Sequence, residues 1–88
     1  MVAMTFKITN EFGLHARPAV QFVKIATQFK SEIKVVNADI EANGKSIMGV
    51  MMLAAAKGTE ITIQAEGVDE TEAVNALGEL VTRGFGEY

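Results

Sequence analysis

The single histidine of the chain is the residue whose type and setting most clearly indicate chemistry. His15 follows Gly13, and Arg17 comes two residues later, where a helical pattern begins. The first N–H groups of a helix lack helical acceptors and, with the helix dipole, favour a bound anion. The N–H groups of Ala16 and Arg17 and the Arg17 guanidinium would hold a phosphoryl group placed on the imidazole. The residues leave two interpretations open, a phosphohistidine site and an exposed histidine near a helix cap without a chemical role.

The elements that must position His15 are predicted from the spacing of apolar residues. Alternation over residues 4–8 predicts a half-buried strand, and an apolar stripe predicts a helix over 16–28 with Pro18 in its first turn. The next elements are predicted as strands at 32–36 and 40–42 around a tight turn at 37–39, followed by a helix that Ser46 caps and that ends near 57–58. A further strand is predicted at 60–65. The last helix is predicted to begin with a capping box of Asp69 and Glu72 and to end at Gly84. This order predicts an α+β domain with helices packed on one face of an antiparallel sheet.

Composition narrows the functional classes. The chain has 88 residues, 49% of them hydrophobic, with no cysteine and one histidine, which predicts one domain over residues 1–88 without a disulfide framework, a metal centre or a cofactor. The longest apolar run is too short to span a membrane, so we expect a cytoplasmic protein with no membrane partner, and a monomer is the default expectation. A net charge of -3 argues against nucleic-acid binding.

The charges are divided unevenly along the chain. Residues 1–57 hold seven basic and four acidic residues, which gives them a net charge of +3. Because the whole chain has a net charge of -3, residues 58–88 have a net charge of -6. If the basic residues converge on one face, that face would steer acidic protein partners. The alternative is a scattered, solvated surface.

Two segments resemble the signatures of a known family. The string Gly13-Leu14-His15-Ala16-Arg17-Pro18-Ala19 is similar to the active-site signature of the HPr family, the histidine phosphocarriers of the bacterial phosphoenolpyruvate-dependent phosphotransferase system. The string Lys45-Ser46-Ile47-Met48-Gly49-Val50-Met51 resembles the second signature of that family. Order, spacing and length agree from about Met4 to Phe85.

The resemblance implies a fold and a set of roles. It implies an open-faced β-sandwich of four antiparallel strands with three helices on one face, in the order βαββαβα. His15 would accept a phosphoryl group on Nδ1 from phosphorylated Enzyme I and pass it to an EIIA-type protein, while Arg17 steadies the phosphate. Such a protein is a stoichiometric carrier and not an enzyme. Ser46 would be phosphorylated by a kinase/phosphorylase in lineages that have one, although a serine at this position also serves as a helix N-cap.

The helix after Ser46 is apolar around most of its circumference, which a surface helix cannot fully bury. We expect Ile47, Met48 and Met51 to form a Met-rich docking patch with Leu14. The alternative for these residues is ordinary core packing, which we expect for Val50, Leu53 and Ala54.

Phe12 departs from the family pattern, because many sugar-branch relatives have a small polar residue there. A bulky apolar residue at this place is similar to the nitrogen-branch paralogues, which act in regulation. A regulatory, phosphorylation-dependent binding module is therefore the second functional hypothesis, with kinases or transcription factors as partners. A small nucleic-acid-binding domain is the third, and the acidic balance opposes it.

Overall fold

The computed structural model describes residues 1–86 of the chain. Along these residues the elements are β1 (Val2–Lys7), α1 (Ala16–Ala26), β2 (Glu32–Asn37), β3 (Ile40–Asn43), α2 (Ile47–Met52), β4 (Glu60–Glu66), α3 (Glu70–Thr82) and the short 3-10 helix η1 (Gly84–Gly86). The predicted order βαββαβα is confirmed. Residues 87 and 88, which the predicted domain includes, lie outside the described residues.

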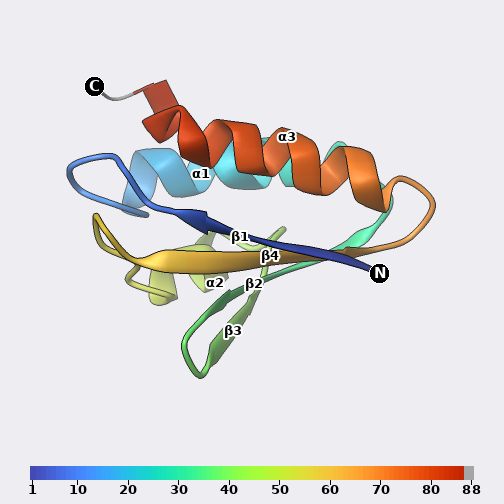
Figure 1. The fold of residues 1–88 in the computed structure, drawn as a ribbon, viewed down its shortest axis with the longest axis horizontal. Helices are drawn as coiled ribbons and strands as arrows, with labels where there is room; N and C mark the ends of the chain where they lie inside the picture. The colour runs from blue at the N-terminus through green and yellow to red at the C-terminus, as the bar shows by residue number, and fades with distance from the viewer. Residues whose placement is uncertain (87–88) are drawn as a thin grey trace.

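The four strands of the described residues form one antiparallel sheet in the order β1-β4-β2-β3. Helices α1 and α3 lie side by side over one face of this sheet (Figure 1), and the short α2 contacts α1 and β3. The predicted hairpin is confirmed, because Asn37 pairs with Ile40 and only two residues form the turn. The predicted class, an open antiparallel sheet with three helices, is therefore also confirmed.

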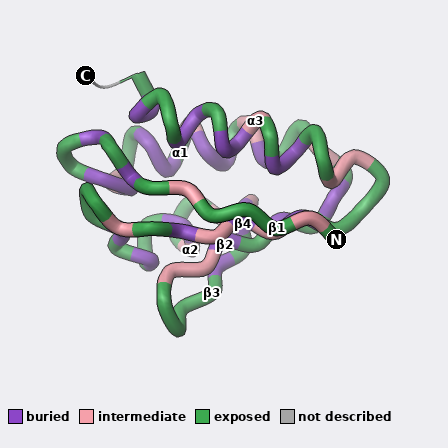
Figure 2. Tube along the Cα trace, in the orientation of Figure 1, coloured by how far each residue is buried: buried purple, intermediate pink, exposed green. Residues whose placement is uncertain are grey.

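The core lies between the sheet and the two long helices. Along β4 the buried residues are Ile61, Ile63 and Ala65, so alternate side chains of this central strand face the helices. Phe22 of α1 and Leu77 of α3 are completely buried against that layer. Figure 2 shows the same division, with purple stretches on the inner sides of α1 and α3. Burial of these apolar side chains is the main force that holds the helices on the sheet.

The end of β1 leads directly to the segment that contains His15. Beyond β1, the Ile8 N–H donates to the Thr59 carbonyl at 2.8 Å, and the Gly58 N–H donates to the Ile8 carbonyl at the same distance. The chain after β1 therefore runs beside the loop between α2 and β4. This pairing brings residues 10–15 and residues 53–59 together at one end of the sheet.

Helix α2 is shorter than predicted. We expected it to end near residues 57–58, but it ends at Met52. Ala54 has a φ of 49°, which is the left-handed region, and a right-handed helix cannot continue through that conformation. The apolar run that suggested a longer helix instead continues as a loop, with Ala55 buried against the core.

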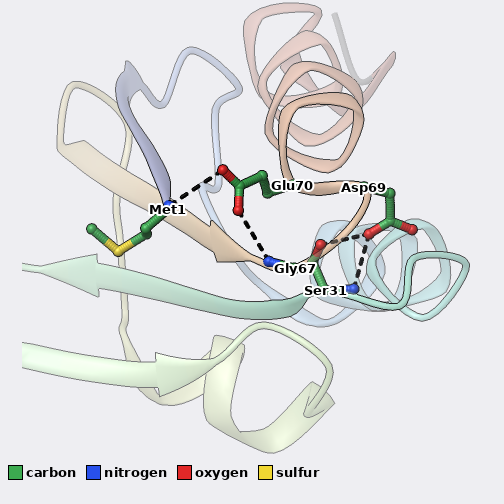
Figure 3. A network of polar contacts seen from close by, with 5 residues as sticks. All are labelled: Met1, Ser31, Gly67, Asp69 and Glu70. Carbon is green, nitrogen blue, oxygen red and sulfur yellow. Dashed lines mark hydrogen bonds and ion pairs between the residues drawn. The ribbon is translucent and has the colours of Figure 1, made fainter.

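The predicted capping box of α3 is wrong. Asp69 is the N-cap residue, but its side chain does not cap the helix. Its carboxylate instead accepts hydrogen bonds from the hydroxyl and the N–H of buried Ser31 and from the N–H of Lys30, as Figure 3 shows for Ser31. The Glu70 carboxylate accepts from the Gly67 N–H at 3.1 Å. Asp69 thus joins the start of α3 to the segment that follows α1. Its side chain makes this tertiary contact in place of a local helix cap.

The Asp69 contacts predict a pH-dependent stability. The hydrogen bond from the Ser31 hydroxyl, followed by that from the Lys30 N–H, lowers the pKa of Asp69 below its ordinary value of 3.8. Because the folded pKa is lowered, the stabilisation is present above pH 3.8 and is lost as the pH falls through the folded pKa. We expect an Asp69→Asn variant to lose less stability than the wild type between about pH 5 and pH 2, measured as urea midpoints. Parallel losses in the two proteins would contradict this linkage.

Candidate functional site

His15 is the N-cap residue of α1, as predicted, with φ -83° and ψ -169°. Its carbonyl accepts the N–H of Ala19 at 2.9 Å, which begins the helical hydrogen bonding. The side chain is partly exposed, and in the described residues it does not cap the helix. The backbone of His15 is therefore held by the helix, and the residue remains partly exposed to solvent.

The loop before His15 is held in place by hydrogen bonds to backbone carbonyls. The side-chain amide of Asn10, which is 1% exposed, donates to the Gly13 carbonyl at 2.8 Å. Gly13 has a φ of 64°, and the next N–H, that of Leu14, donates to the Ala55 carbonyl at 2.9 Å. The sequence did not indicate Asn10 or Ala55 as site residues. Their contribution is to fix where α1, and hence His15, begins.

The first turn of α1 is suited to an anion. The N–H groups of Ala16 and Arg17 have no acceptor within the helix. This turn contains no acidic residue. Arg17 is exposed and belongs to the same turn of α1. An anionic group on the His15 ring would therefore meet a favourable dipole, two backbone donors and one cation.

A shallow hollow of about 260 Å³ opens beside His15. Its lining is mainly apolar and consists of Phe12, Leu14, His15, Met51, Ala54, Ala55 and Ala56. The ring of Phe12 stands perpendicular to the imidazole, with ring centroids 5.8 Å apart. A larger hollow of about 500 Å³ follows β2 and β3, but it shares no lining residue with the hollow at His15.

The predicted docking residues do not all lie on the surface. Ile47, Met48 and Met51 of α2 are 42%, 74% and 40% exposed, as a docking surface requires. Leu14 is only 3% exposed, but it lines the hollow beside His15, so its part in docking stays a prediction. The hydrogen bond from its N–H to Ala55 draws Leu14 inward, and its side chain joins the core.

An exposed apolar residue of α2 was not predicted as a docking residue. Met52 is 72% exposed, and its spacing of four from Met48 places both on the same side of α2. That spacing is visible in the sequence and was the available signal. We call Phe12, Ile47, Met48, Met51 and Met52 the apolar surface. Met51 and Phe12 line the same hollow as His15, which connects this surface to the site.

Ser46 is the N-cap of α2, and its Oγ accepts the N–H of Gly49 at 3.0 Å. The predicted capping role is therefore confirmed. The residue is partly exposed. A kinase would have to reach this oxygen for the second predicted role, phosphorylation, which stays a prediction.

The basic residues of the first part of the chain converge only partly. Arg17 and Lys24 are both exposed on α1, seven positions apart and therefore on one side of it. Lys45 instead donates to the Phe29 carbonyl at 2.7 Å, and Lys34 pairs with Glu41 at 3.5 Å. The exposed side of α1 therefore carries positive charge that continues from Arg17, whereas Lys34 and Lys45 are engaged in other contacts.

Neither a metal centre nor a membrane span is found in the described part of the chain. Among residues 1–86, His, Cys, Asp and Glu nowhere gather in threes as they would around a metal ion. No helix in that range is long and apolar enough to cross a membrane.

Comparison with known proteins places the chain in a family. Residues 2–83 match the family model described as the PTS HPr component phosphorylation site. The phosphocarrier protein HPr of Neisseria meningitidis serogroup A is 52% identical over 87 residues, which is 99% of this chain and 98% of the relative. The crystal structure of HPr-C-His from Thermoanaerobacter tengcongensis has a TM-score of 0.96 and 45% identity, covering 100% of this chain and 99% of that one.

A further crystal structure from Thermoanaerobacter tengcongensis, of an HPr dimer, is 46% identical with a TM-score of 0.79, and it covers 99% of this chain and 100% of that one. The monomer expected for the present chain stays a prediction. The family match covers the segment that contains His15 and Arg17, and the relatives agree over almost the whole length. The chain belongs to the HPr family of phosphocarrier proteins of the phosphotransferase system.

Proposed function

We propose that His15 carries the phosphoryl group, accepting it from phosphorylated Enzyme I and passing it to an EIIA-type protein. The observation that carries this proposal is the position of His15, the only histidine, at the N-terminus of α1 with Arg17 in the first turn. The apolar surface adjoins that histidine, so a partner docked on α2 and Phe12 would bring its own phosphohistidine to the imidazole.

The transfer step exchanges one nitrogen–phosphorus bond for another. The lone pair of His15 Nδ1 attacks the phosphorus, the bond from phosphorus to the donor histidine breaks, and its electron pair stays on the donor nitrogen. The N–H groups of the first turn and the Arg17 guanidinium stabilise the phosphoryl oxygens. One cation and a few backbone donors bind the phosphoryl group only weakly, as a carrier that must release it requires. The partner protein supplies the remaining stabilisation of the transition state.

The test is phosphoryl transfer from phosphoenolpyruvate through Enzyme I with Mg²⁺. We expect an acid-labile label on the chain, as for a phosphohistidine, and we expect this label to leave when an unlabelled EIIA-type protein is added. Enzyme I of the sugar branch and of the nitrogen branch should both be tried, because Phe12 leaves the branch open. No label on folded protein with either one would favour the regulatory binding module instead.

The apolar surface can be tested separately from the chemistry. We expect Met48→Asp to raise the KM of Enzyme I for this chain by about 5- to 10-fold, because a charge placed on a docking surface must be desolvated. Val68→Asp is the matched control, since Val68 is 85% exposed and belongs to the loop between β4 and α3, which lies at the opposite end of the molecule from the loop between β1 and α1 (Figure 1). Its KM should equal that of the wild type. An unfolded Met48→Asp protein, or equal effects of both substitutions, would contradict the docking role.

We further propose that phosphorylation of Ser46 regulates docking and leaves the fold intact. A Ser46→Asp variant keeps a capping acceptor for the Gly49 N–H, so its stability should stay within about 0.5 kcal/mol of the wild type. Its added charge beside the apolar surface should slow transfer by repelling acidic partners. Ser46→Ala should do the reverse, losing roughly 1 kcal/mol of stability with unchanged transfer. Chemical denaturation measures the stability of both variants, and labelling measures their transfer rates. An unfolded Ser46→Asp protein would refute the proposal.

A further inference from the structure

Phe12 combines high exposure with a specific contact. It is 74% exposed, although burial of a phenyl ring is strongly favourable. Its ring nevertheless lies perpendicular to that of His15, 5.8 Å away, which is a preferred geometry for aromatic pairs. Both rings line the hollow between α2 and the loop at residues 54–56. The contact is therefore made on the open side of the site, where a partner would approach.

The backbone under Phe12 is held firmly. The following residue, Gly13, has its N–H bonded to the Asn10 carbonyl at 3.3 Å and its carbonyl bonded to the Asn10 side chain. A Cβ at Gly13 would lie only 2.1 Å from the Ala55 oxygen, so the loop is closely packed against its neighbour. Phe12 thus projects from a fixed base and can restrict the group it touches.

We infer that Phe12 is a positioning residue that holds the His15 imidazole in one ring orientation for phosphoryl transfer. The last torsion of a histidine is broad, so a neighbouring ring can select among the orientations of the imidazole. Attack on phosphorus needs the nitrogen lone pair aligned with the bond that breaks, and the perpendicular phenyl ring removes misaligned orientations. This inference rests on the proposed function, since it concerns the reactivity of His15.

Two substitutions separate ring positioning from apolar docking. Phe12→Leu keeps apolar bulk for a partner but lacks the flat ring, whereas Phe12→Tyr keeps the ring. We expect Phe12→Leu to lower kcat for labelling by Enzyme I about 3- to 10-fold with little change in KM, and the ring-keeping Phe12→Tyr to recover most of that lost kcat. In NMR spectra of the free protein, the His15 ring protons should lose the ring-current shift in Phe12→Leu and keep it in Phe12→Tyr.

Two results would overturn the inference. Unchanged His15 ring-proton shifts in Phe12→Leu would show that Phe12 does not orient the imidazole. A rise in KM with kcat unchanged would show that Phe12 is a docking contact only. Failure of the proposed function looks different, because wild-type protein would then take no label at all. The NMR measurement needs no Enzyme I and decides about the ring contact in either case.

Discussion

Replacement of His15 by asparagine is expected to abolish acid-labile labelling while the fold stays at least as stable as the wild type. His15 is the N-cap of α1, but in the described residues its ring does not cap the helix. Asparagine is among the best N-cap residues, so its side chain should accept an N–H of the first turn and add about 0.5 to 1 kcal/mol. Its amide is not a phosphoryl acceptor of the imidazole kind, so the chemistry is lost.

This substitution separates the two effects, because labelling should be lost while the free energy of unfolding should rise or stay the same. Labelling by phosphoenolpyruvate and Enzyme I measures the first, and urea denaturation measures the second. Arg17→Ala provides a graded comparison, because it leaves the imidazole and the backbone N–H groups in place and should slow transfer without abolishing it. Labelling of the His15→Asn protein at the wild-type rate would refute the assignment of His15.

The substitution Gly13→Ala is expected to cost roughly 2 to 5 kcal/mol of stability, from a left-handed backbone and an overlap with its neighbours. Gly13 has a φ of +64°, and an added Cβ would lie 2.1 Å from the Ala55 oxygen and 2.9 Å from the Ala56 Cα. These neighbours are backbone atoms, and the Ala55 oxygen also accepts the Leu14 N–H at 2.9 Å. Relief of the overlap must therefore break that bond and displace His15.

Gly58→Ala is the matched control for the backbone effect. Gly58 also has a positive φ, +90°, but a Cβ there meets nothing within 4 Å. It should lose only about 1 to 2 kcal/mol and keep wild-type transfer. Urea midpoints of both variants, and labelling of the folded fraction of each, check the prediction. Equal losses of stability with equal transfer would show that the Gly13 contact does not position the site.

Features that depend on interactions between neighbouring residues could be predicted from the sequence. The Ser46 cap joins residues three positions apart, and the His15 cap and Arg17 lie in one helical turn, so neighbouring residues specify them. The order of strands and helices follows from apolar periodicity, which reflects burial along each element. In contrast, Asp69 was assigned to a local capping box, but its partner Ser31 lies 38 positions away.

The family signature, the order of the elements and the placement of His15 and Arg17 at the start of α1 could all be predicted from local patterns of residues. Three features became visible only in the folded domain: Leu14 is buried, α2 ends at Met52, and the Phe12 ring contacts the imidazole. The burial of Leu14 and the path of the chain after Met52 depend on the loop of residues 53–59, which lies against residues 8–15 through hydrogen bonds between segments far apart in the chain. Such contacts are selected by the packing of the whole domain, and no local pattern of residues encodes them.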